Sequence, residues 1–355
     1  MNLAPFPLEP REVELIWGGD ALVRHYGKPG DPSKKIGESW ECWDQNLVGA
    51  GAFAGSTVGE LRAELGKELV GKLDPSRIFP ILTKFIDARA ALSVQVHPDD
   101  AYAERVEGQP NGKTECWFVL EAEPNATIVL GWKRSTSRNE FLERLKEGSL
   151  DDLLRRVPVR PGDVFYLPAG TLHAIGAGII LYETQQASDL TYRVFDYNRL
   201  GSDGKPRELH VEKAADVLDY RRSEAGALAS LEYVLDGLLR TTLVADPRFT
   251  VERVECGAQA QGLDLEGMPL AVTALDASLE LEAQGESITL KPYESALVPA
   301  ALDVVMVRAP EGSGRFLTAA PPSDHEALPR RYARAAVPVA QSTDFLAQFQ
   351  RLNLG

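Results

Sequence analysis

Short apolar stretches, broken by glycine and proline turns, run through most of this chain. Five of the clearest span residues 90–97, 114–120, 126–132, 163–168 and 178–184. Many of their residues are β-branched or aromatic, as strands prefer. Strands at this regular spacing indicate a sandwich or a barrel rather than βαβ units. The pattern therefore predicts a mainly β protein.

Helix-start signals occur in only a few places. Three have a Ser or Thr followed three residues later by an acidic residue: Thr57 with Glu60, Ser137 with Glu140, and Ser149 with Asp152. This is the spacing of a helix capping box or a related cap. After the first signal, Leu61, Leu65 and Leu69 share one helix face. The other two signals predict a helical insertion over 133–157, and a further short helix is expected over 211–219.

The second half of the chain returns to a β pattern. Residues 240–256 and 278–302 alternate apolar and polar positions, as half-buried strands do. The histidines on either side of this region are His210 and His325, so it supplies no histidine for a metal site. We therefore expect a second β module without a metal site. The segment 324–350 fits no pattern that predicts a structure.

Length and composition narrow the class of protein. With 355 residues, 44% of them hydrophobic, the chain is long enough for two or three packed modules. It has no apolar run of membrane-spanning length and no signal-peptide pattern at its start, and its three cysteines are scattered. These features predict a cytoplasmic protein without a disulfide framework. The net charge of −14 disfavours nucleic acid, so an anionic substrate would need a local cationic pocket.

A set of metal-binding side chains is suggested by spacing. Gln95 and His97 are two apart in an expected strand and so point to one side. Glu115 begins another strand, with Lys113 two residues before it, and His173 follows an apolar run and a turn. Two imidazoles and a carboxylate are a common catalytic zinc set, and an amide oxygen suits the same ions. Taken one at a time, each is more often an ordinary polar residue, so spacing leaves both interpretations open.

The turn before His173 carries a more specific signal. Gly162, Pro168, Gly170 and His173 have the spacing of the second conserved motif of the cupin fold. Four further segments, residues 37–44, 79–100, 112–124 and 181–199, closely resemble the type I phosphomannose isomerases, in the same order along the chain. The resemblance covers about residues 10–210 and extends more weakly beyond. It implies a zinc-dependent isomerase that interconverts mannose 6-phosphate and fructose 6-phosphate.

The resemblance also implies roles for individual residues. The positions of its four zinc ligands, for one ion per chain, are Gln95, His97, Glu115 and His173. Its catalytic arginine falls on Arg193, whose fork of donors suits an enediolate or a phosphate. Lys84 and Lys113 are expected to bind substrate phosphate and oxyanion, although either could be a surface lysine, and Lys113 could instead be the base. Glu183 is expected to be a proton shuttle or only a hydrogen-bond acceptor, so the base stays open.

Some positions depart from the family's pattern or remain ambiguous. The first cupin motif reads QxH rather than HxH, a departure that phosphomannose isomerases share. Ala177 stands where an Asn often follows the second motif, and Ile175 stands where some members carry a Tyr. Glu41, between Trp40 and Trp43, is expected either near the pocket or in a structural role.

Together these observations predict two cupin-like jelly-roll β-barrel modules with a small helical insertion. The expected catalytic domain spans 1–132 and 158–210, the insertion 133–157, and the degenerate C-terminal module 211–355. The expected partner is a hexose phosphate, with no nucleic acid or membrane partner, and the protein is expected to be a monomer or a weak homodimer. The alternatives are an isomerase for another sugar phosphate, such as glucose 6-phosphate, and a non-catalytic metal-binding cupin that binds sugar.

Overall fold

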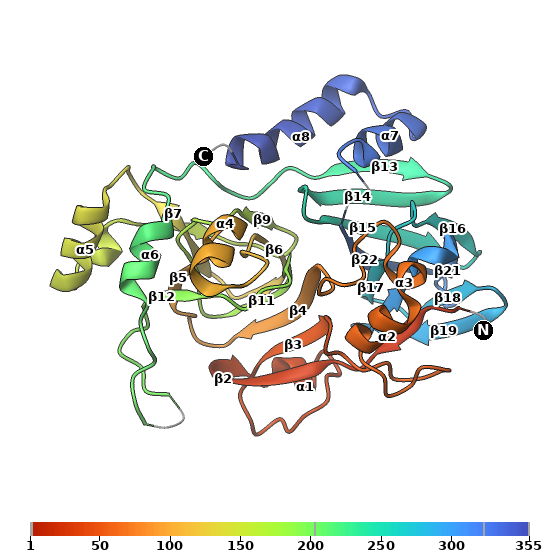
Figure 1. The fold of residues 1–355 in the computed structure, drawn as a ribbon, viewed down its shortest axis with the longest axis horizontal. Coiled ribbons are helices and arrows are strands. Elements are labelled where there is room, and N and C mark those ends of the chain that lie inside the picture. The colour runs from red at the N-terminus through yellow and green to blue at the C-terminus, as the bar shows by residue number, and fades with distance from the viewer. Residues whose placement is uncertain (1–2, 202–203, 322–323, 354–355) are drawn as a thin grey trace.

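The strands form four antiparallel sheets, arranged as two pairs (Figure 1). This computed structural model describes residues 3–201, 204–321 and 324–353. The mainly β fold expected from the apolar pattern is confirmed. All five stretches contain a strand, although the stretch at 90–97 contributes only Val94–Val96.

The first pair of sheets is built from the N-terminal half of the chain. One sheet has six strands in the order β2 (Arg11–Gly19), β3 (Ile36–Cys42), β4 (Ile81–Ala88), β11 (Ile179–Gln186), β6 (Glu115–Ala122) and β9 (Val164–Leu167). The other has five strands in the order β12 (Tyr192–Phe195), β5 (Val94–Val96), β10 (His173–Ile175), β7 (Thr127–Trp132) and β8 (Leu154–Pro158). We call this pair the first module.

The second module is formed mainly by the C-terminal half. Its seven-stranded sheet has the order β1 (Phe6–Leu8), β20 (Ser295–Val298), β17 (Leu270–Ala274), β22 (Ser313–Ala320), β15 (Thr250–Gly257), β14 (Leu238–Ala245) and β13 (Leu231–Leu235). Its four-stranded sheet has the order β16 (Gln261–Asp264), β21 (Val304–Arg308), β18 (Leu279–Ala283) and β19 (Glu286–Leu290). Strand β1 pairs with β20, although the expected catalytic domain starts at residue 1. The first strand of the chain therefore belongs to the second module.

The six-stranded sheet lies between the interior of the first module and the second module. Every residue of β4 and of β11 is buried. Leu181 on one face packs with Phe165 inside the first module. Its neighbour Tyr182 on the other face belongs to the core that includes Leu297 of the second module. Because side chains alternate along a strand, polar residues at odd-numbered positions of β11, such as Glu183, face the interior of the first module.

The helices form where the capping signals occur, with two corrections. The Thr57–Glu60 capping box starts α2 (Val58–Leu65), and the Ser137 cap starts α5 (Arg138–Glu147). Helix α6 (Val211–Val217) forms within the expected range. Leu69 lies in a separate short helix, α3 (Lys67–Val70), because Gly66 adopts a φ of 52° and ends α2.

The second correction concerns the end of the expected insertion. The helical prediction for residues after 152 is wrong, because the chain makes one 3₁₀ turn (Leu150–Asp152) and then strand β8. Pairing with β7, where Val157 lies opposite Ile128, outweighs the weak local signal at Ser149. Ser149 makes no side-chain cap hydrogen bond.

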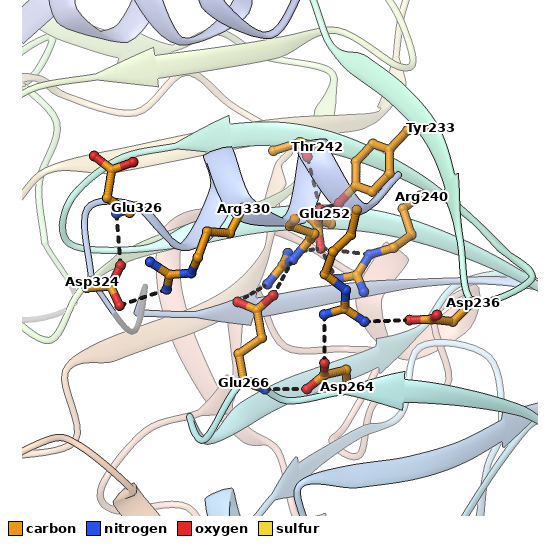
Figure 2. A network of polar contacts seen from close by, with 12 residues as sticks. Tyr233, Asp236, Arg240, Thr242, Glu252, Asp264, Glu266, Asp324, Glu326 and Arg330 are labelled. Carbon is orange, nitrogen blue, oxygen red and sulfur yellow. Dashed lines mark hydrogen bonds and ion pairs between the residues drawn. The ribbon is translucent and has the colours of Figure 1, made fainter. Parts of the chain in front are cut away.

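Two helices form in the tail that sequence patterns left without a structure, α7 (Ala327–Arg334) and α8 (Val339–Asn353). Helix α7 is fixed to the second module by a buried polar network around Glu252, a residue of β15 (Figure 2). Arg331 of α7 donates to Glu252 Oε2 at 2.8 Å, and Arg240 of β14 forms a second ion pair with the same carboxylate. Tyr233 and Thr242 donate to its other oxygen.

The structure also describes the cysteines and the apolar character of the helices. All three cysteines are free and buried, as expected for a chain without a disulfide framework. Among the helices of the described residues, none is both long enough and apolar enough to cross a membrane.

Candidate metal and substrate site

A pocket in the first module lies between its two sheets and collects most of the expected site residues. Charged groups along its wall are Arg11, Glu38, Lys84, Lys113, Glu183, Asp189, Arg193 and Arg207, and the wall also includes Gln95 and His173. The basic side chains outnumber the acidic ones, in a protein with a net charge of −14. The local cationic pocket expected for an anionic substrate is therefore present.

Three buried side chains, of which His173 lines this pocket, could hold a metal ion. One ligand atom from each of His97, Glu115 and His173 lies within 4.8 Å of the others. His97 Nε2 is 3.5 Å from Glu115 Oε2, and His173 Nε2 is 3.2 Å from Glu115 Oε1. All three residues are 1–2% exposed. His97 Nε2 and Glu115 Oε2 have no hydrogen-bond partner in the described part of the chain, which is costly for buried polar atoms unless an ion binds them.

Backbone carbonyls fix the direction of both imidazole rings. Leu190 O accepts a hydrogen bond from His97 Nδ1 at 2.7 Å, and Thr171 O accepts one from His173 Nδ1 at 2.8 Å. With Nδ1 as the donor, Nε2 carries the lone pair and points toward Glu115. This is the arrangement found for histidines that bind metals.

Gln95 lies beside this cluster in the five-stranded sheet. It pairs directly with His173 of β10 and with Arg193 of β12, so the three residues form a row across the sheet. The Gln95 amide nitrogen is 3.4 Å from His173 Nε2, and Ser93 Oγ donates to the amide oxygen at 3.2 Å. Rotation of the amide group would exchange its oxygen and nitrogen. Gln95 is therefore close enough to take part in the same site.

Burial and neighbouring charges set the protonation states of the cluster. Burial lowers the pKa of His97 to about 3 and also lowers the pKa of His173, so both rings are neutral at physiological pH. Burial opposes ionisation of Glu115, but the Lys113 ammonium, 3.3 Å from Oε2, holds the pKa of this carboxyl well below its usual range. Neutral imidazoles and an ionised carboxylate are the forms that bind a divalent metal.

Lys84 and Glu183 form a second buried pair on the pocket wall. Lys84 Nζ lies 2.7 Å from Glu183 Oε2 and 3.5 Å from Glu38. Trp117 Nε1 donates to Glu183 Oε1 at 2.8 Å. Burial raises the pKa of Glu183, and the Lys84 charge offsets this only in part. Burial alone would lower the pKa of Lys84, but the two carboxylates outweigh it and raise the value, so Lys84 stays protonated.

Arg193 reaches the pocket from β12. Its Nη1 donates to Glu208 O at 2.9 Å, while its buried Nε has no hydrogen-bond partner in the described residues. Burial and the nearby Arg207 guanidinium lower its pKa. Asp196 Oδ2 accepts from Arg207 Nε at 2.7 Å, and Asp196 Oδ1 accepts from Arg207 Nη2 at 2.6 Å. An anion at this end of the pocket would meet a cation that is not already paired with a carboxylate.

Sequence reasoning missed several pocket residues. Arg11, Glu38, Asp189 and Arg207 all line the pocket. Side chains alternate between the two faces of a strand. Within 37–44 this rule could have assigned Glu38 and Trp40 to the pocket face and Glu41 to the other face. Arg207 lies in a loop, where no periodicity exists to place it.

Glu41 has a structural position away from the pocket. It pairs with buried Lys28 at 2.7 Å and accepts hydrogen bonds from Ser39 and from Ser295 of the second module. The structural alternative considered for Glu41 is therefore the correct one. His25, which is exposed, and His210, whose ring accepts from the Arg193 backbone amide, are not members of the metal-ligand cluster.

Comparison with known proteins places this chain and its fold in a class. The family model for the catalytic domain of type I phosphomannose isomerase matches residues 6–123. A mannose-6-phosphate isomerase from Streptococcus mutans is 43% identical over 70% of this chain and 77% of its own. The crystal structure of the Bacillus subtilis mannose 6-phosphate isomerase is 33% identical, with a TM-score of 0.81 over 89% of this chain and 99% of its own. A mannose 6-phosphate isomerase solved with zinc bound shares the fold, at 16% identity and a TM-score of 0.72, over 90% of this chain and all of its own.

The fold and site thus define an isomerase of phosphorylated sugars. More narrowly, the chain belongs to the type I phosphomannose isomerase family, whose relatives at this level of identity are named mannose-6-phosphate isomerases. It is an enzyme of the aldose–ketose isomerase type.

Proposed function

We propose that this enzyme interconverts mannose 6-phosphate and fructose 6-phosphate with one zinc ion per chain, held by Gln95, His97, Glu115 and His173. The observation that carries the proposal is the buried His–Glu–His cluster, which borders a cationic pocket through His173, in a chain 43% identical to a mannose-6-phosphate isomerase. Zinc is chosen because imidazole and carboxylate ligands suit it, and because one relative was solved with zinc.

The ligand atoms fit such an ion. The two imidazoles present neutral Nε2 atoms, the carboxylate is ionised, and two of these buried atoms have no hydrogen bond in the described chain. When bound, a divalent ion would polarise substrate oxygens and orient the sugar. Zinc in catalytic sites can expand to five ligands, so a substrate oxygen could bind in addition to the three strong ligands and the amide.

The protein's own residues would move the protons. Conversion of the aldose into the ketose removes a proton from C2 and adds one to C1, while O1 gains a proton and O2 loses one. Glu183 faces the pocket with a raised pKa, so its carboxylate can accept the C2 proton and return it to C1. Trp117 and Lys84 would hold the carboxylate in place.

Cationic groups would stabilise the charge that develops on the sugar oxygens. Lys113, 3.3 Å from Glu115, lies at the metal cluster, and Arg193 lies next to Gln95 in the sheet. Both would donate hydrogen bonds to the enediolate, where preorganised donors have their largest effect on rate. Lys84 stays protonated and would contribute to binding of the substrate. Lys113 remains the alternative base.

The finer architecture belongs to this proposal too. We propose that each pair of sheets is a cupin-like jelly-roll module, supported by the cupin spacing from Gly162 to His173 and by the placement of His173 at the cluster. The division into a catalytic domain, an insertion at 133–157 and a C-terminal module without a metal site is kept, with β1 assigned to the last. A cytoplasmic location and a monomer or weak homodimer stay predictions.

A coupled assay tests the function. The purified protein is expected to convert mannose 6-phosphate, to lose activity after treatment with a chelator, and to regain it with zinc. A parallel series with glucose 6-phosphate and other hexose phosphates supplies the control. If the zinc-loaded protein leaves mannose 6-phosphate unchanged but converts another hexose phosphate, a different isomerase is indicated. If it converts none, the non-catalytic sugar-binding alternative is favoured.

A further inference from the structure

One row of directly paired residues crosses the pocket wall formed by the six-stranded sheet. The pairs run from Arg11 to Trp40, from Trp40 to Lys84, from Lys84 to Glu183 and from Glu183 to Trp117. Side chains directly opposite each other on neighbouring strands project to the same face, and all five line the pocket. Arg11 therefore occupies the end of the pocket wall farthest from β6, the strand that carries Glu115.

The length of this row matches the length of a sugar phosphate. Neighbouring strands are about 4.8 Å apart, so the backbone at Arg11 lies roughly 19 Å across the sheet from β6. An open-chain hexose phosphate, with standard bond lengths, extends about 9 Å from C1 to phosphorus. The remaining distance is divided between the Glu115 side chain with its ion and the long Arg11 side chain. A sugar with C1 and C2 at the cluster can thus direct its phosphate toward Arg11.

The charges along the pocket also single out Arg11. Lys113 is paired with Glu115, Lys84 with Glu183, and Arg207 makes two hydrogen bonds to Asp196.

Arg11, in contrast, forms no ion pair with a carboxylate in the described chain; its Nη1 donates to the neutral Gln45 at 2.8 Å. Arg193 also forms no ion pair with a carboxylate in the described chain. It lies beside Gln95, however, next to the proposed position of C1 and C2 of the sugar. A phosphate dianion is bound best by a cation whose charge is not already neutralised.

Trp40 holds the Arg11 guanidinium in a position suited to phosphate. The Arg11 Cζ atom lies 5.1 Å from the centre of the Trp40 ring, and Trp40 Nε1 donates to Glu38 at 2.7 Å, which fixes the ring. A guanidinium stacked on an aromatic face keeps its edge donors available for a two-pronged hydrogen bond to phosphate. Lys84 Nζ lies 5.9 Å from the same ring, but it is already paired with Glu183 and Glu38.

We propose that Arg11, stacked on Trp40 at the rim of the pocket, binds the phosphate group of the substrate and so selects phosphorylated over free sugars. This inference rests on the proposed function, because it assumes that the sugar's C1 and C2 lie at the metal cluster.

The test compares three variants of the zinc-loaded, full-length enzyme: Arg11→Gln, Arg207→Gln and, as a control, Arg89→Gln, whose side chain is 70% exposed. For each, kcat and KM for mannose 6-phosphate are measured with the inhibition constants of inorganic phosphate and of the neutral sugar alcohol mannitol. Loss of a charge-assisted hydrogen bond predicts that Arg11→Gln raises KM and the phosphate inhibition constant about 10- to 100-fold. The value of kcat, the zinc content and mannitol inhibition should stay close to those of the control.

Three results would overturn the inference. Unchanged phosphate inhibition in Arg11→Gln, with loss of inhibition in Arg207→Gln, would place the phosphate at the opposite end of the pocket. Equal weakening of phosphate and mannitol inhibition would show that Arg11 only maintains the shape of the pocket. No recovery of KM or phosphate inhibition in Arg11→Lys would argue against recognition through positive charge.

Failure of the proposed function would look different. In that case the unaltered enzyme would not convert mannose 6-phosphate at all. Binding of inorganic phosphate to the unaltered protein and to Arg11→Gln, measured by calorimetry, would still decide whether Arg11 is an anion site: weaker binding by the variant supports it, and equal binding overturns it.

Discussion

Lys84 and Glu183 form an ion pair across β4 and β11 on the pocket face, with Nζ 2.7 Å from Oε2 and both side chains less than a tenth exposed. Lys28 and Glu41 form a pair with the same 2.7 Å separation on the opposite side, toward the second module. The two pairs therefore provide a matched comparison between a buried ion pair in the site and one outside it.

Replacing either lysine should destabilise the protein, but only one replacement should reduce catalysis directly. Lys84→Met and Lys28→Met each leave a buried carboxylate unpaired, so each should lower the free energy of unfolding by about 3–5 kcal/mol. At a temperature where both remain folded, Lys84→Met should lose roughly 10- to 100-fold in kcat/KM through the lost charge, while Lys28→Met stays near normal. Urea unfolding and initial rates measure the two effects, and an equal loss of activity in both would contradict the role of Lys84.

His173→Ala should lose most of the bound metal. Its Nε2 faces Glu115 and is held there by the carbonyl of Thr171, so the substitution removes a ligand that is already oriented for the ion. Elemental analysis of the purified protein measures the zinc content, and exposed His25→Ala is the control. A full equivalent of zinc in the His173 variant would remove it from the ligand set.

Arg193→Ala should keep its metal and lose most of its turnover. Removing a preorganised donor to a developing oxyanion typically lowers kcat on the order of 100- to 1000-fold. Steady-state kinetics beside zinc analysis separates this effect from loss of metal, and the exposed Arg160→Ala serves as the control. If kcat stays within a few-fold of normal, Arg193 takes no part in the reaction.

Stability at acidic pH should depend on Glu252 in the second module. Burial alone would raise its pKa, but Arg240 and Arg331 outweigh burial and lower it to about 2, from 4.5. A lowered folded-state pKa stabilises the protein above the unfolded value of 4.5, and this stabilisation is lost as the pH falls toward 2. The difference between the folded-state and unfolded-state pKa values corresponds to roughly 3 kcal/mol in the free energy of unfolding.

Glu252→Gln removes the titrating group but keeps its shape. Its free energy of unfolding should be lower than that of the unaltered protein at pH 7, and the gap should narrow as the pH is lowered from 5 to 3. Urea unfolding at several pH values, with exposed Glu286→Gln as control, measures this. A gap that does not change with pH would show that Glu252 does not titrate in this range.

The helix starts were predicted correctly from the sequence because they depend on neighbouring residues. Thr57 and Glu60 form their capping box within one helical turn, and Ser137 caps its helix in the same way. The metal cluster was expected because two short motifs and a family resemblance pointed to it. His97, Glu115 and His173 do lie together, although their roles still await experiment.

The missed features depend on partners far apart in the chain. Strand register places Arg11 beside Trp40 and Trp40 beside Lys84, and the sequence does not specify this register. Residues 154–158 became a strand because β7 was available to pair with them. Helix α7 was not expected, since its basic side chains find their carboxylates some 65 to 100 residues earlier, in β15 and in two turns of the second module.

The pairing of β1 with β20 has a consequence for biosynthesis. Phe6 lies opposite Leu297, about 290 residues later. At 5–20 residues per second, a ribosome needs on the order of 15–60 s to make the partner strand after β1 emerges. During that time β1 can pair only along its other edge, where Leu8 forms a bridge with Val48, so closure of the second module must wait until β20 has been made.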